Sequence, residues 1–495
     1  HPLVSLFITN SLTGEKEEFK PIIPNSVSIY FCGLTVSDLP HLGHARAWVH
    51  VDVMRRWLEH LGFSVTYVEN FTDINEKIVA RIGESDYGES ESEVATYFIN
   101  KSLEDMNSLG LKSAHAYPKA SEHIPEIIDI ISSLIDSNHA YESNGSVYFD
   151  VSSFDRYGEL SKPNLDDESS LDTPEKASEK KHPYDFALWK AGQVPPESIS
   201  KYRDPNLPPI TLPSGDVWDS PWAPGRPGWH IECSAMSMAH LSNNIDIHAG
   251  GQDLMFPHHE NEKAQSEAST GEKFANFWVH IRLLETQGEK MSSSLKNYFS
   301  VSNSISEFGS NSIKMFLIST SYPRHQTYSE ASLHEALERW GRLERTYLRT
   351  TNVLKKSPPD STIVDESLRK SIESSVQNFQ TALNDDFNTR EALVAIFDVV
   401  NSLNQHIETH EKCDHFALDL AIKTLDDLAR DVLGFSFDLI NPNELFSEEI
   451  TSLINIREVE RSKGNYEKAD EMRKKLGLLG VVVEDTENGP TYRRK

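Results

Sequence analysis

A strand, a helix and a second strand follow one another within residues 26–72, and this order constrains the fold more than any other feature of the sequence. The segment SVSIYFCGLTV at 26–36 is short and rich in β-branched and aromatic residues, as buried strands are. Residues 43–62 carry apolar side chains every three or four positions and end at Gly62, which is typical of an amphipathic helix. FSVTYVENFT at 63–72 has the pattern of the next strand. This unit predicts a parallel sheet in an α/β domain.

The rest of the chain changes composition several times, and 495 residues suffice for about three or four domains. α/β patterns return in NIDIHAGGQDL and FANFWVHIRLL, Pro-, Ser- and Asp-rich connectors interrupt the middle, and long amphipathic stretches follow residue 326. We therefore expect 1–110 and 226–325 to be two halves of one α/β domain, 111–225 an insertion with mobile loops, 326–445 a helical bundle and 446–495 a small C-terminal domain.

Acidic residues dominate the charge: Asp and Glu number 76 against 48 Lys and Arg, which gives a formal net charge of −28. A protein that simply coats nucleic acid would carry net positive charge, so this class is excluded, although a local basic patch is not. Two interpretations of the acidity remain open. The chain is either an ordinary acidic cytosolic protein or one adapted to high salt, where dense surface carboxylates keep a protein hydrated.

Cysteine usage and hydrophobicity indicate where the protein works. Three cysteines in 495 residues cannot form a disulfide framework, so a reducing compartment is expected. The sequence has no run of about 18 apolar residues, and its N-terminal segment lacks the pattern of a secretory signal. We therefore expect a cytoplasmic protein with no membrane partner. A monomer is also expected, but it does not follow from these patterns.

The first motif, PHLGH at 40–44, lies between the first strand and its helix. Open α/β sheets bind ligands at the carboxyl ends of their strands, and a helix N-terminus there favours anions. Gly43 would let a ligand approach the backbone, and His41 and His44 can donate hydrogen bonds to phosphate oxygens. The alternative is a turn with two surface histidines, and the pattern alone leaves both open.

A second motif, EKMSSSLKN at 289–297, has a lysine followed by hydroxyl groups. Such a loop can hold a polyphosphate electrostatically. Lysine–serine loops are common, however, so an ordinary surface loop is the favoured interpretation of this motif taken alone.

The third motif is PHHENE, in which His258 and Glu262 are four residues apart on a helix expected to start near a proline. Cys32 and Cys233, expected at the ends of strands or loops, would complete a set of four ligands that zinc accepts. Spacing alone favours another interpretation: the helix start is solvated, and the two thiols are buried and unrelated to it. Cys413 has no partner pattern and stays unassigned.

Together the motifs resemble those of class I aminoacyl-tRNA synthetases, and the residues around them resemble the cysteinyl-tRNA synthetase family. The resemblance runs in order from about residue 6 to residue 495 and is carried by CGLTVSDLPHLGHAR, NFTDINEKI, GRPGWHIECSAMS, DIHAGGQDLMFPHHENEKAQSEA and YEKADEMRKKLGLLGVVVEDTENGPTYRRK. It implies a Rossmann-like parallel-sheet catalytic domain with a connective insertion, then a helical tRNA-binding bundle and an anticodon-binding domain. The implied reaction joins L-cysteine to tRNA(Cys) through a cysteinyl-adenylate made from ATP.

The resemblance also implies the site residues and cofactors. One zinc ion would select the substrate thiol, and Mg²⁺ would accompany ATP. The implied roles are: zinc ligands Cys32, Cys233, His258 and Glu262; cysteine pocket Thr72 and Trp229; ATP contacts Gly43, His44, Lys290 and Ser293; catalysis by His41, His44 and Lys290. Candidate tRNA phosphate contacts are Arg473, Lys474, Lys475, Arg493, Arg494 and Lys495, with a solvated charged helix as the alternative.

One departure from the family pattern affects the ATP site. The family loop usually reads Lys-Met-Ser-Lys-Ser, and here Ser293 replaces the second lysine, which in the family contacts ATP. Either Lys290 and the serine hydroxyls suffice, or Lys296 takes over, or activation is slow. We expect adequate activity.

Two other functions remain open. A cysteine-adenylating ligase of the mycothiol-pathway type shares the core and the zinc site, but lacks the full C-terminal module that ends here in TYRRK. A non-catalytic tRNA- or zinc-binding paralogue would account for the missing loop lysine, but would not require His41, His44 and Lys290 to be present.

Overall fold

The computed structural model describes residues 5–167, 177–207, 211–293, 295–296, 299–437, 448–487 and 489–494. The chain forms two compact units, each assembled from separate parts of the sequence. The first contains residues 1–303, 316–332 and 378–393, and the second contains 304–315, 333–377 and 394–495.

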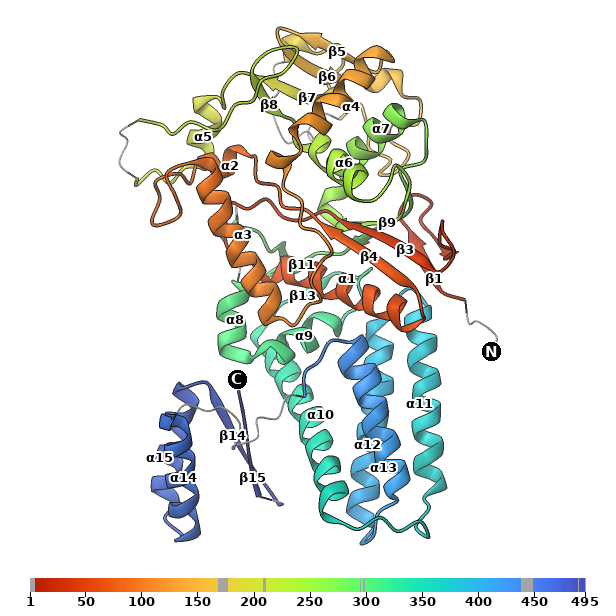
Figure 1. Cartoon of the computed structure of the whole chain (residues 1–495), viewed down its shortest axis with the longest axis vertical. Helices are drawn as coiled ribbons and strands as arrows, with labels where there is room; N and C mark the ends of the chain where they lie inside the picture. Colours follow the sequence, from red (N-terminus) through yellow and green to blue (C-terminus); the bar gives the residue numbers. More distant parts are fainter. Residues whose placement is uncertain are drawn as a thin grey trace. The chain divides into compact units, whose positions relative to one another are not determined.

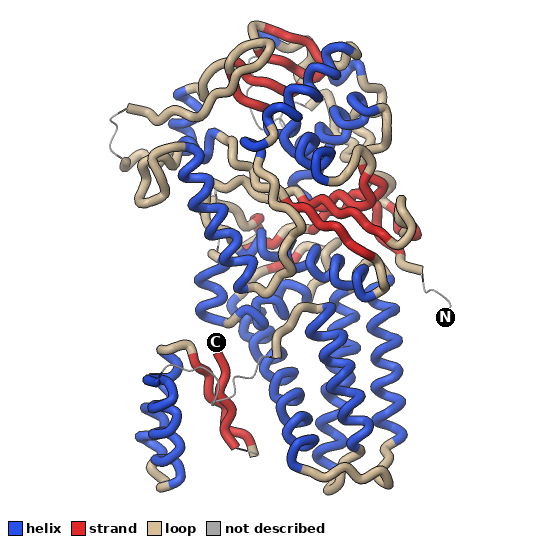
Figure 2. Tube along the Cα trace, viewed as in Figure 1, coloured by secondary structure: helices blue, strands red, loops and turns tan. Residues whose placement is uncertain are grey.

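A four-stranded parallel sheet forms the centre of the first unit (Figures 1 and 2). Its order is β10 (Ala275–Ile281), β9 (Ile245–Gly251), β3 (Ser26–Phe31), β4 (Ser64–Glu69). Helix α1 (Leu42–His60) connects β3 to β4 and packs on one face of the sheet. The predicted strand–helix–strand unit and the parallel sheet are thereby confirmed, and the carboxyl ends of all four strands lie at one edge.

The helix ends where the sequence predicts. Leu61 caps α1, and Gly62 follows with φ 99°, a left-handed conformation that suits glycine and stops the helix. Trp57 and Leu58 are fully buried on the face of α1 turned toward the interior. Polar side chains on the rest of its last turns agree with the amphipathic pattern.

The middle of the chain folds into a second, antiparallel sheet that the sequence analysis does not anticipate. It contains β5 (Ala140–Ser143), β6 (Ser146–Phe149), β7 (Phe186–Ala191) and β8 (Gly225–Pro227), in that order. Its strands are short and separated by long polar connectors, so their alternation is hard to recognise. Helix α4 (Ile124–Asp136) buries Ile127, Ile131 and Leu134 in the same core as these strands.

Further elements complete the first unit. They are β1 (Phe7–Asn10), β2 (Glu15–Glu18), α2 (Glu76–Val79), α3 (Glu91–Ser108), α5 (Pro196–Tyr202), α6 (Trp229–His240), α7 (Glu260–Thr270), β11 (Leu284–Thr286), β12 (Glu289–Lys290) and β13 (Gln326–Thr327). Helices α8 (Val301–Phe308) and α9 (Ser310–Ile318) follow β12 along the chain.

The predicted helical region is confirmed. It contains α10 (Glu330–Lys356), α11 (Glu366–Asn384), α12 (Thr389–Thr409) and α13 (His415–Thr424), which continues as a wider helix over Leu425–Val432. Within the second unit, Asn404 on α12 donates to Thr346 Oγ1 on α10 over 2.9 Å.

The C-terminal region begins with two helices, α14 (Glu448–Ser462) and α15 (Tyr466–Leu478). Gly464 lies between them at φ 76° and permits the turn. The segment that ends in basic residues forms β15 (Gly489–Arg494), which pairs antiparallel with β14 (Val481–Thr486).

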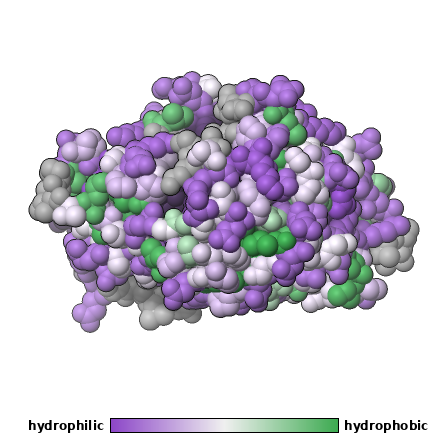
Figure 3. Space-filling view, turned by 90° about the horizontal axis from the view of Figure 1, so that it is seen from above, coloured by the Kyte–Doolittle hydropathy of each residue, from purple (hydrophilic) through white to green (hydrophobic). Residues whose placement is uncertain are grey.

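Polar side chains cover much of the surface. Figure 3 shows one face that is mostly hydrophilic, with apolar side chains in small separate groups. Among the described residues, no helix combines the length and the apolar character needed to cross a bilayer.

Candidate active site

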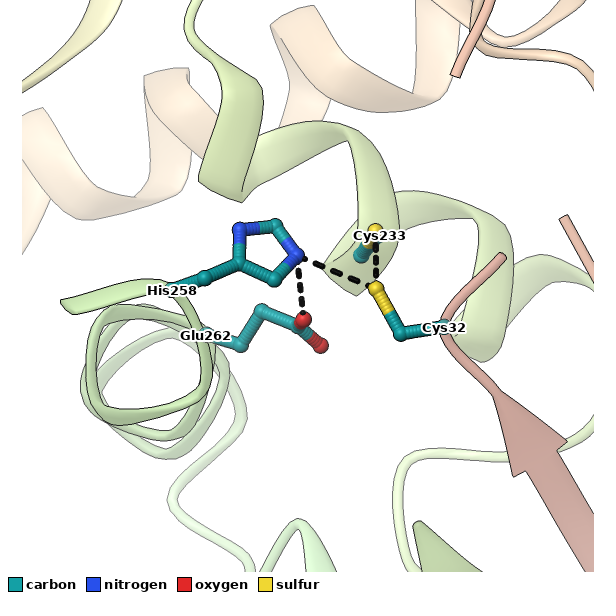
Figure 4. Close-up of side chains that lie close together, drawn as sticks. All are labelled: Cys32, Cys233, His258 and Glu262. Atoms are coloured by element: carbon teal, nitrogen blue, oxygen red, sulfur yellow. Dashed lines mark hydrogen bonds and ion pairs between the residues drawn. The ribbon is translucent and has the colours of Figure 1, made fainter. Parts of the chain in front are cut away.

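Four side chains from three separate segments of the sequence meet beyond the carboxyl end of β3 (Figure 4). Cys32 Sγ lies 3.5 Å from Cys233 Sγ and 3.2 Å from His258 Nε2, and His258 Nε2 lies 2.9 Å from Glu262 Oε1. One ligand atom from each of these residues lies within 4.8 Å of the others, and all four residues are buried. Two sulfurs, one imidazole nitrogen and one carboxylate oxygen form a donor set that zinc binds.

Different elements position the four side chains. Cys32 follows β3 directly, and its N–H donates to Ala249 O on β9 over 3.0 Å. His258 and Glu262 share a face at the start of α7, as their spacing predicts. The expectation that Cys233 lies at a strand or loop end is wrong. Cys233 lies in the second turn of α6, because the helix starts directly after Gly228, at Trp229.

The cluster carries charge on its own side chains. A hydrogen bond with Cys233 and the neighbouring His258 lower the pKa of Cys32 to about 6 although burial opposes this. Burial disfavours the charged His258, yet Cys32 and Glu262 raise its pKa to about 10. Burial also opposes ionisation of Glu262, but His248 and His258 keep its pKa below the ordinary value. Burial raises the pKa of Cys233. The thiolate and the carboxylate offer the negative charge that a divalent cation requires, so the residues fit a zinc ion.

A second layer of side chains orients two of these four residues, Glu262 and His258. His248 Nε2 lies 2.7 Å from Glu262 Oε2, on the far side of that carboxylate from His258. His230 Nδ1 lies 2.9 Å from His258 Nδ1, and the Trp229 ring stacks on the His258 ring at 4.0 Å. Partners of this kind fix the orientation of metal ligands. Trp229, predicted to line a substrate pocket, thus lies beside the cluster.

Two more buried histidines extend this layer. His259 Nδ1 lies 2.8 Å from His280 Nε2, and His280 Nδ1 lies 2.6 Å from Ser11 Oγ. The sequence analysis does not single out His230, His248 or His280. The available signal is that His248 and His280 lie within the predicted strands NIDIHAGGQDL and FANFWVHIRLL, and a histidine buried in a strand needs a polar partner.

Thr72 lies next to the chain segment that leaves Cys32. Its N–H donates to Leu34 O and its carbonyl accepts from Val36 N, each over 3.2 Å. Its side chain is fully buried, and Asn70 Nδ2 lies 3.4 Å from Thr72 Oγ1. The threonine is therefore close to the cluster in the chain path, with its hydroxyl in a fixed orientation.

At the start of α1, His41 and His44 cap the helix reciprocally. His44 N donates to His41 Nδ1 over 3.4 Å, His41 N donates to His44 Nδ1 over 3.2 Å, and the two rings stack at 3.7 Å. A Cβ at Gly43 would lie 2.8 Å from the His41 ring, so glycine is needed for this arrangement. Since each Nδ1 accepts a hydrogen bond, each neutral ring carries its proton on Nε2.

Both capping histidines are neutral near pH 7. Burial, together with the neighbouring His44, lowers the pKa of His41 to about 2, and burial lowers that of His44 to about 4. They therefore act as hydrogen-bond donors through Nε2 and do not contribute a positive charge. The positive end of the α1 dipole remains as an attraction for anions.

The lysine–serine loop is held against this helix start. Lys290 ends the short hairpin of β11 and β12, and Met291 N donates to Leu284 O over 2.9 Å. Further along, Leu42 N donates to Phe299 O and Val301 N donates to Pro40 O, over 2.9 and 3.0 Å. The structure thus brings the PHLGH and KMSSS motifs together.

Several cations of the C-terminal region have acidic neighbours in the protein. Arg473 pairs with Asp485 at 3.7 Å, Lys475 with Glu471 at 3.3 Å, and Arg493 with Glu344 at 2.7 Å. Lys474 is exposed. The Arg494 side chain and Lys495 lie outside the described residues.

Comparison with known proteins identifies the family. Residues 18–338 match the model for the class I (C) tRNA synthetase catalytic domain, 378–438 the DALR domain, and 443–493 the cysteinyl-tRNA ligase anticodon-binding domain. In fold, the chain resembles *Mycobacterium tuberculosis* methionyl-tRNA synthetase in complex with methionyl-adenylate, with a TM-score of 0.61 and 11% identity over 83% of this chain and 92% of the other. The parallel sheet, the two motifs at its carboxyl edge and these matches define a class I aminoacyl-tRNA synthetase.

Sequence similarity to curated relatives identifies the family within this class of synthetases. Cysteine–tRNA ligase of *Haloarcula marismortui* is 52% identical and covers 99% of this chain and 100% of its own length. That of *Halobacterium salinarum* is 49% identical over 99% of each chain. The chain belongs to the cysteine–tRNA ligase family.

Proposed function

We propose that this enzyme activates L-cysteine with ATP and transfers it to the 3′ end of tRNA(Cys). The observation that carries the proposal is the meeting of Cys32, Cys233, His258 and Glu262 at the edge of the sheet where α1 begins. A sulfur-rich metal centre next to an anion-binding helix start suits a substrate that has both a thiol and a carboxylate.

Zinc would be held by these four residues, with His248 and His230 orienting Glu262 and His258. When bound, zinc prefers soft sulfur to a hydroxyl, and this favours cysteine over serine, two substrates that an ordinary pocket separates poorly. Trp229 and Thr72 would close the pocket around the rest of the amino acid. The fixed contacts of Thr72 and the stacking of Trp229 on His258 support this role.

In the activation step, a cysteine carboxylate oxygen attacks the α-phosphorus of ATP and pyrophosphate leaves. His41 and His44 would donate from Nε2 to phosphate oxygens, and Lys290 would bind the departing pyrophosphate together with Mg²⁺. Gly43 allows the His41 ring to lie over the helix start, and Ser293 offers a hydroxyl from the loop. Catalysis then rests on position and on preorganised donors rather than on proton transfer by these neutral histidines.

In the transfer step, a 3′-terminal ribose hydroxyl of tRNA attacks the carbonyl carbon of the adenylate and AMP leaves. The C-terminal module would read the anticodon, with Lys474 and the other cations near the end of the chain as phosphate contacts. Three of the candidates would first have to exchange their acidic partners for phosphate: Arg473, Lys475 and Arg493. Among the described candidates, Lys474 can therefore bind phosphate most easily.

The test is charging of a tRNA(Cys) transcript by the full-length protein with ATP, Mg²⁺ and labelled cysteine, with serine in parallel. Charging with cysteine and not with serine is the expected result. Cysteine-dependent pyrophosphate exchange without charging would favour a ligase of the mycothiol-pathway type. Failure of both reactions with zinc bound would favour the non-catalytic paralogue. The match to a cysteinyl-tRNA ligase anticodon-binding domain supports the synthetase over these two.

The proposal includes a cytoplasmic monomer. Cys32, Cys233 and Cys413 are all free thiols, which a reducing compartment preserves. Gel filtration with light scattering would test the monomer.

A further inference from the structure

The loop between Met291 and Phe299 is fixed to the start of α1 at both of its ends. At the first end, Met291 O lies 3.7 Å from the position that a Cβ on Gly43 would occupy. At the second end, Ser300 forms an antiparallel bridge with His41, and Phe299 O accepts from Leu42 N. The described residues at the two ends of the loop therefore lie beside the helix N-terminus, where the phosphates of ATP are proposed to bind.

Lys296 lies within this loop in a conformation that is costly for a lysine. Its φ is 53°, in the left-handed region that glycine adopts without penalty. Lys296 N donates to Ser293 O over 3.3 Å, and Leu295 N donates to Ser292 Oγ over 3.2 Å. This turn brings Lys296 back beside Ser293, the position at which the chain lacks the second lysine of the family loop.

The Lys296 side chain is also available to a ligand. It is exposed, and within the part of the chain that the structure describes it has neither an ion pair nor a side-chain hydrogen bond. In a protein of net charge −28, an unpaired lysine in a loop whose two ends contact the start of α1 adds local attraction for a polyphosphate there. A lysine retained where glycine would be unstrained indicates a use for its charge.

We infer that Lys296 binds the β- and γ-phosphates of ATP during activation, and so supplies the second loop cation that Ser293 does not. The inference rests on the proposed function, because it names a contact in the same ATP site. Lys290, Lys296 and the α1 N-terminus would then share the charge of the polyphosphate. No proton transfer is required of Lys296, which acts as a charge that strengthens as pyrophosphate separates.

The experiment measures cysteine-dependent pyrophosphate exchange and, separately, ATP–Mg²⁺ affinity by calorimetry, on full-length zinc-loaded protein. Lys296→Ala and Lys296→Gly should each lower kcat/KM for ATP by about ten- to a hundred-fold and weaken ATP binding. Lys296→Arg should retain most of the activity. Lys273→Ala, which removes an exposed lysine after α7, is the matched control and should leave both measurements unchanged.

Two further measurements separate a charge effect from loop damage. Lys296→Gly relieves the left-handed strain, so equal or better activity in that variant would overturn the inference. Adding Ser293→Lys to Lys296→Gly should restore most of the exchange rate, and no rescue would also overturn it. Transfer to tRNA from preformed cysteinyl-adenylate should not change. If the unaltered protein binds ATP but shows no exchange, the proposed function fails while the calorimetry still decides the role of Lys296.

Discussion

At the scale of single residues, the structure identifies His248 as a residue that orients a ligand of the proposed metal centre. Its Nε2 lies 2.7 Å from Glu262 Oε2 and fixes that carboxylate from the side away from His258. Replacing such a partner typically weakens metal binding, so we expect His248→Ala to lower zinc affinity by about ten- to a hundred-fold. Competition with a chromophoric chelator measures this. His334→Ala, an exposed histidine on α10, is the control, and equal affinities in the two variants would contradict the assignment.

A second prediction concerns pH. Burial, with the charges of His248 and Arg282, lowers the pKa of His280 to about 3, whereas an unfolded histidine titrates near 6.5. Below pH 6.5 the unfolded chain binds a proton that the folded chain does not, so His280 makes the free energy of unfolding fall as pH falls from 6.5 toward 3. The loss approaches about 1.4 kcal/mol per pH unit.

Urea unfolding at pH 7.5, 6.5 and 5.5 checks this. His280→Gln can keep the contacts to Ser11 and His259 without titrating, and should flatten the dependence by about one proton. An unchanged slope would show that His280 does not contribute. His50, His230 and His259 are also buried with lowered pKa values and should maintain the rest of the dependence.

The residues of the site could be predicted to different degrees. Spacing places His258 and Glu262 on one face, because four residues make about one helical turn. Spacing does not connect them with Cys32 and Cys233, since more than 200 residues separate the two cysteines and only the folded sheet and α6 bring them within 3.5 Å. Family resemblance supplies that connection. Neither spacing nor family resemblance identifies His248 and His280, because their role depends on which face of their strands is turned toward the cluster.

At the scale of elements, Arg46 forms hydrogen bonds that connect α1 with residues 317–326, which follow the lysine–serine loop in the sequence. Its fully buried guanidinium donates to the carbonyls of Arg282, Leu317, Thr320, Ser321 and Arg324 and to Gln326 Oε1, over 2.6–3.2 Å. Removing the arginine would take one buried donor from each of these oxygens, and only some of them have a second, such as His50 Nε2 for Leu317 O and Arg324 N for Ser321 O. We expect Arg46→Met to lower the free energy of unfolding by about 3 to 5 kcal/mol.

Chemical denaturation measures that loss. The matched control is Arg349→Met, which removes a partly exposed ion pair with Glu408 and should cost less than about 1 kcal/mol. A similar small cost at Arg46 would mean that other contacts hold the segment on α1. Because α1 carries His41 and His44, we also expect Arg46→Met to reduce pyrophosphate exchange more than it reduces zinc content.

Some elements could be predicted and others could not, for physical reasons. Strands β3 and β4 are short and rich in β-branched and aromatic residues, and α1 has a clear period and a terminal glycine. The sheet of β5 to β8 is missed because its strands are three to six residues long and its connectors are polar. The break between α14 and α15 is marked only by Gly464, and a single glycine also occurs within helices.

At the scale of the whole molecule, the C-terminal module has its own small core of Ile454, Leu476, Val481, Val483 and Tyr492. It follows the last described residue of the helical region, Phe437, along the chain. A protein ending at residue 437 should therefore keep cysteine-dependent pyrophosphate exchange within about three-fold and lose most of its tRNA charging. Parallel assays measure the two reactions. Unchanged charging would mean that the module does not contribute to tRNA binding.

The net charge leads to a further prediction. Carboxylates repel one another in the compact state, and salt screens that repulsion. With a net charge of −28, the protein should have a higher melting temperature in 2 M KCl than in 0.1 M KCl, and charging should be faster there if the acidity is an adaptation to salt. Calorimetry and charging at both concentrations check this. A flat or falling melting temperature would favour the ordinary acidic protein.

The closeness of the Cys32 and Cys233 sulfurs has a consequence beyond substrate selection. At 3.5 Å, with the Cys32 thiol already acidified, the pair needs only a small movement to join as a disulfide once an oxidant removes two electrons and two protons. A zinc ion held by both sulfurs would block that reaction. Under the proposed function, chains that have not yet bound zinc would therefore be the ones open to oxidation.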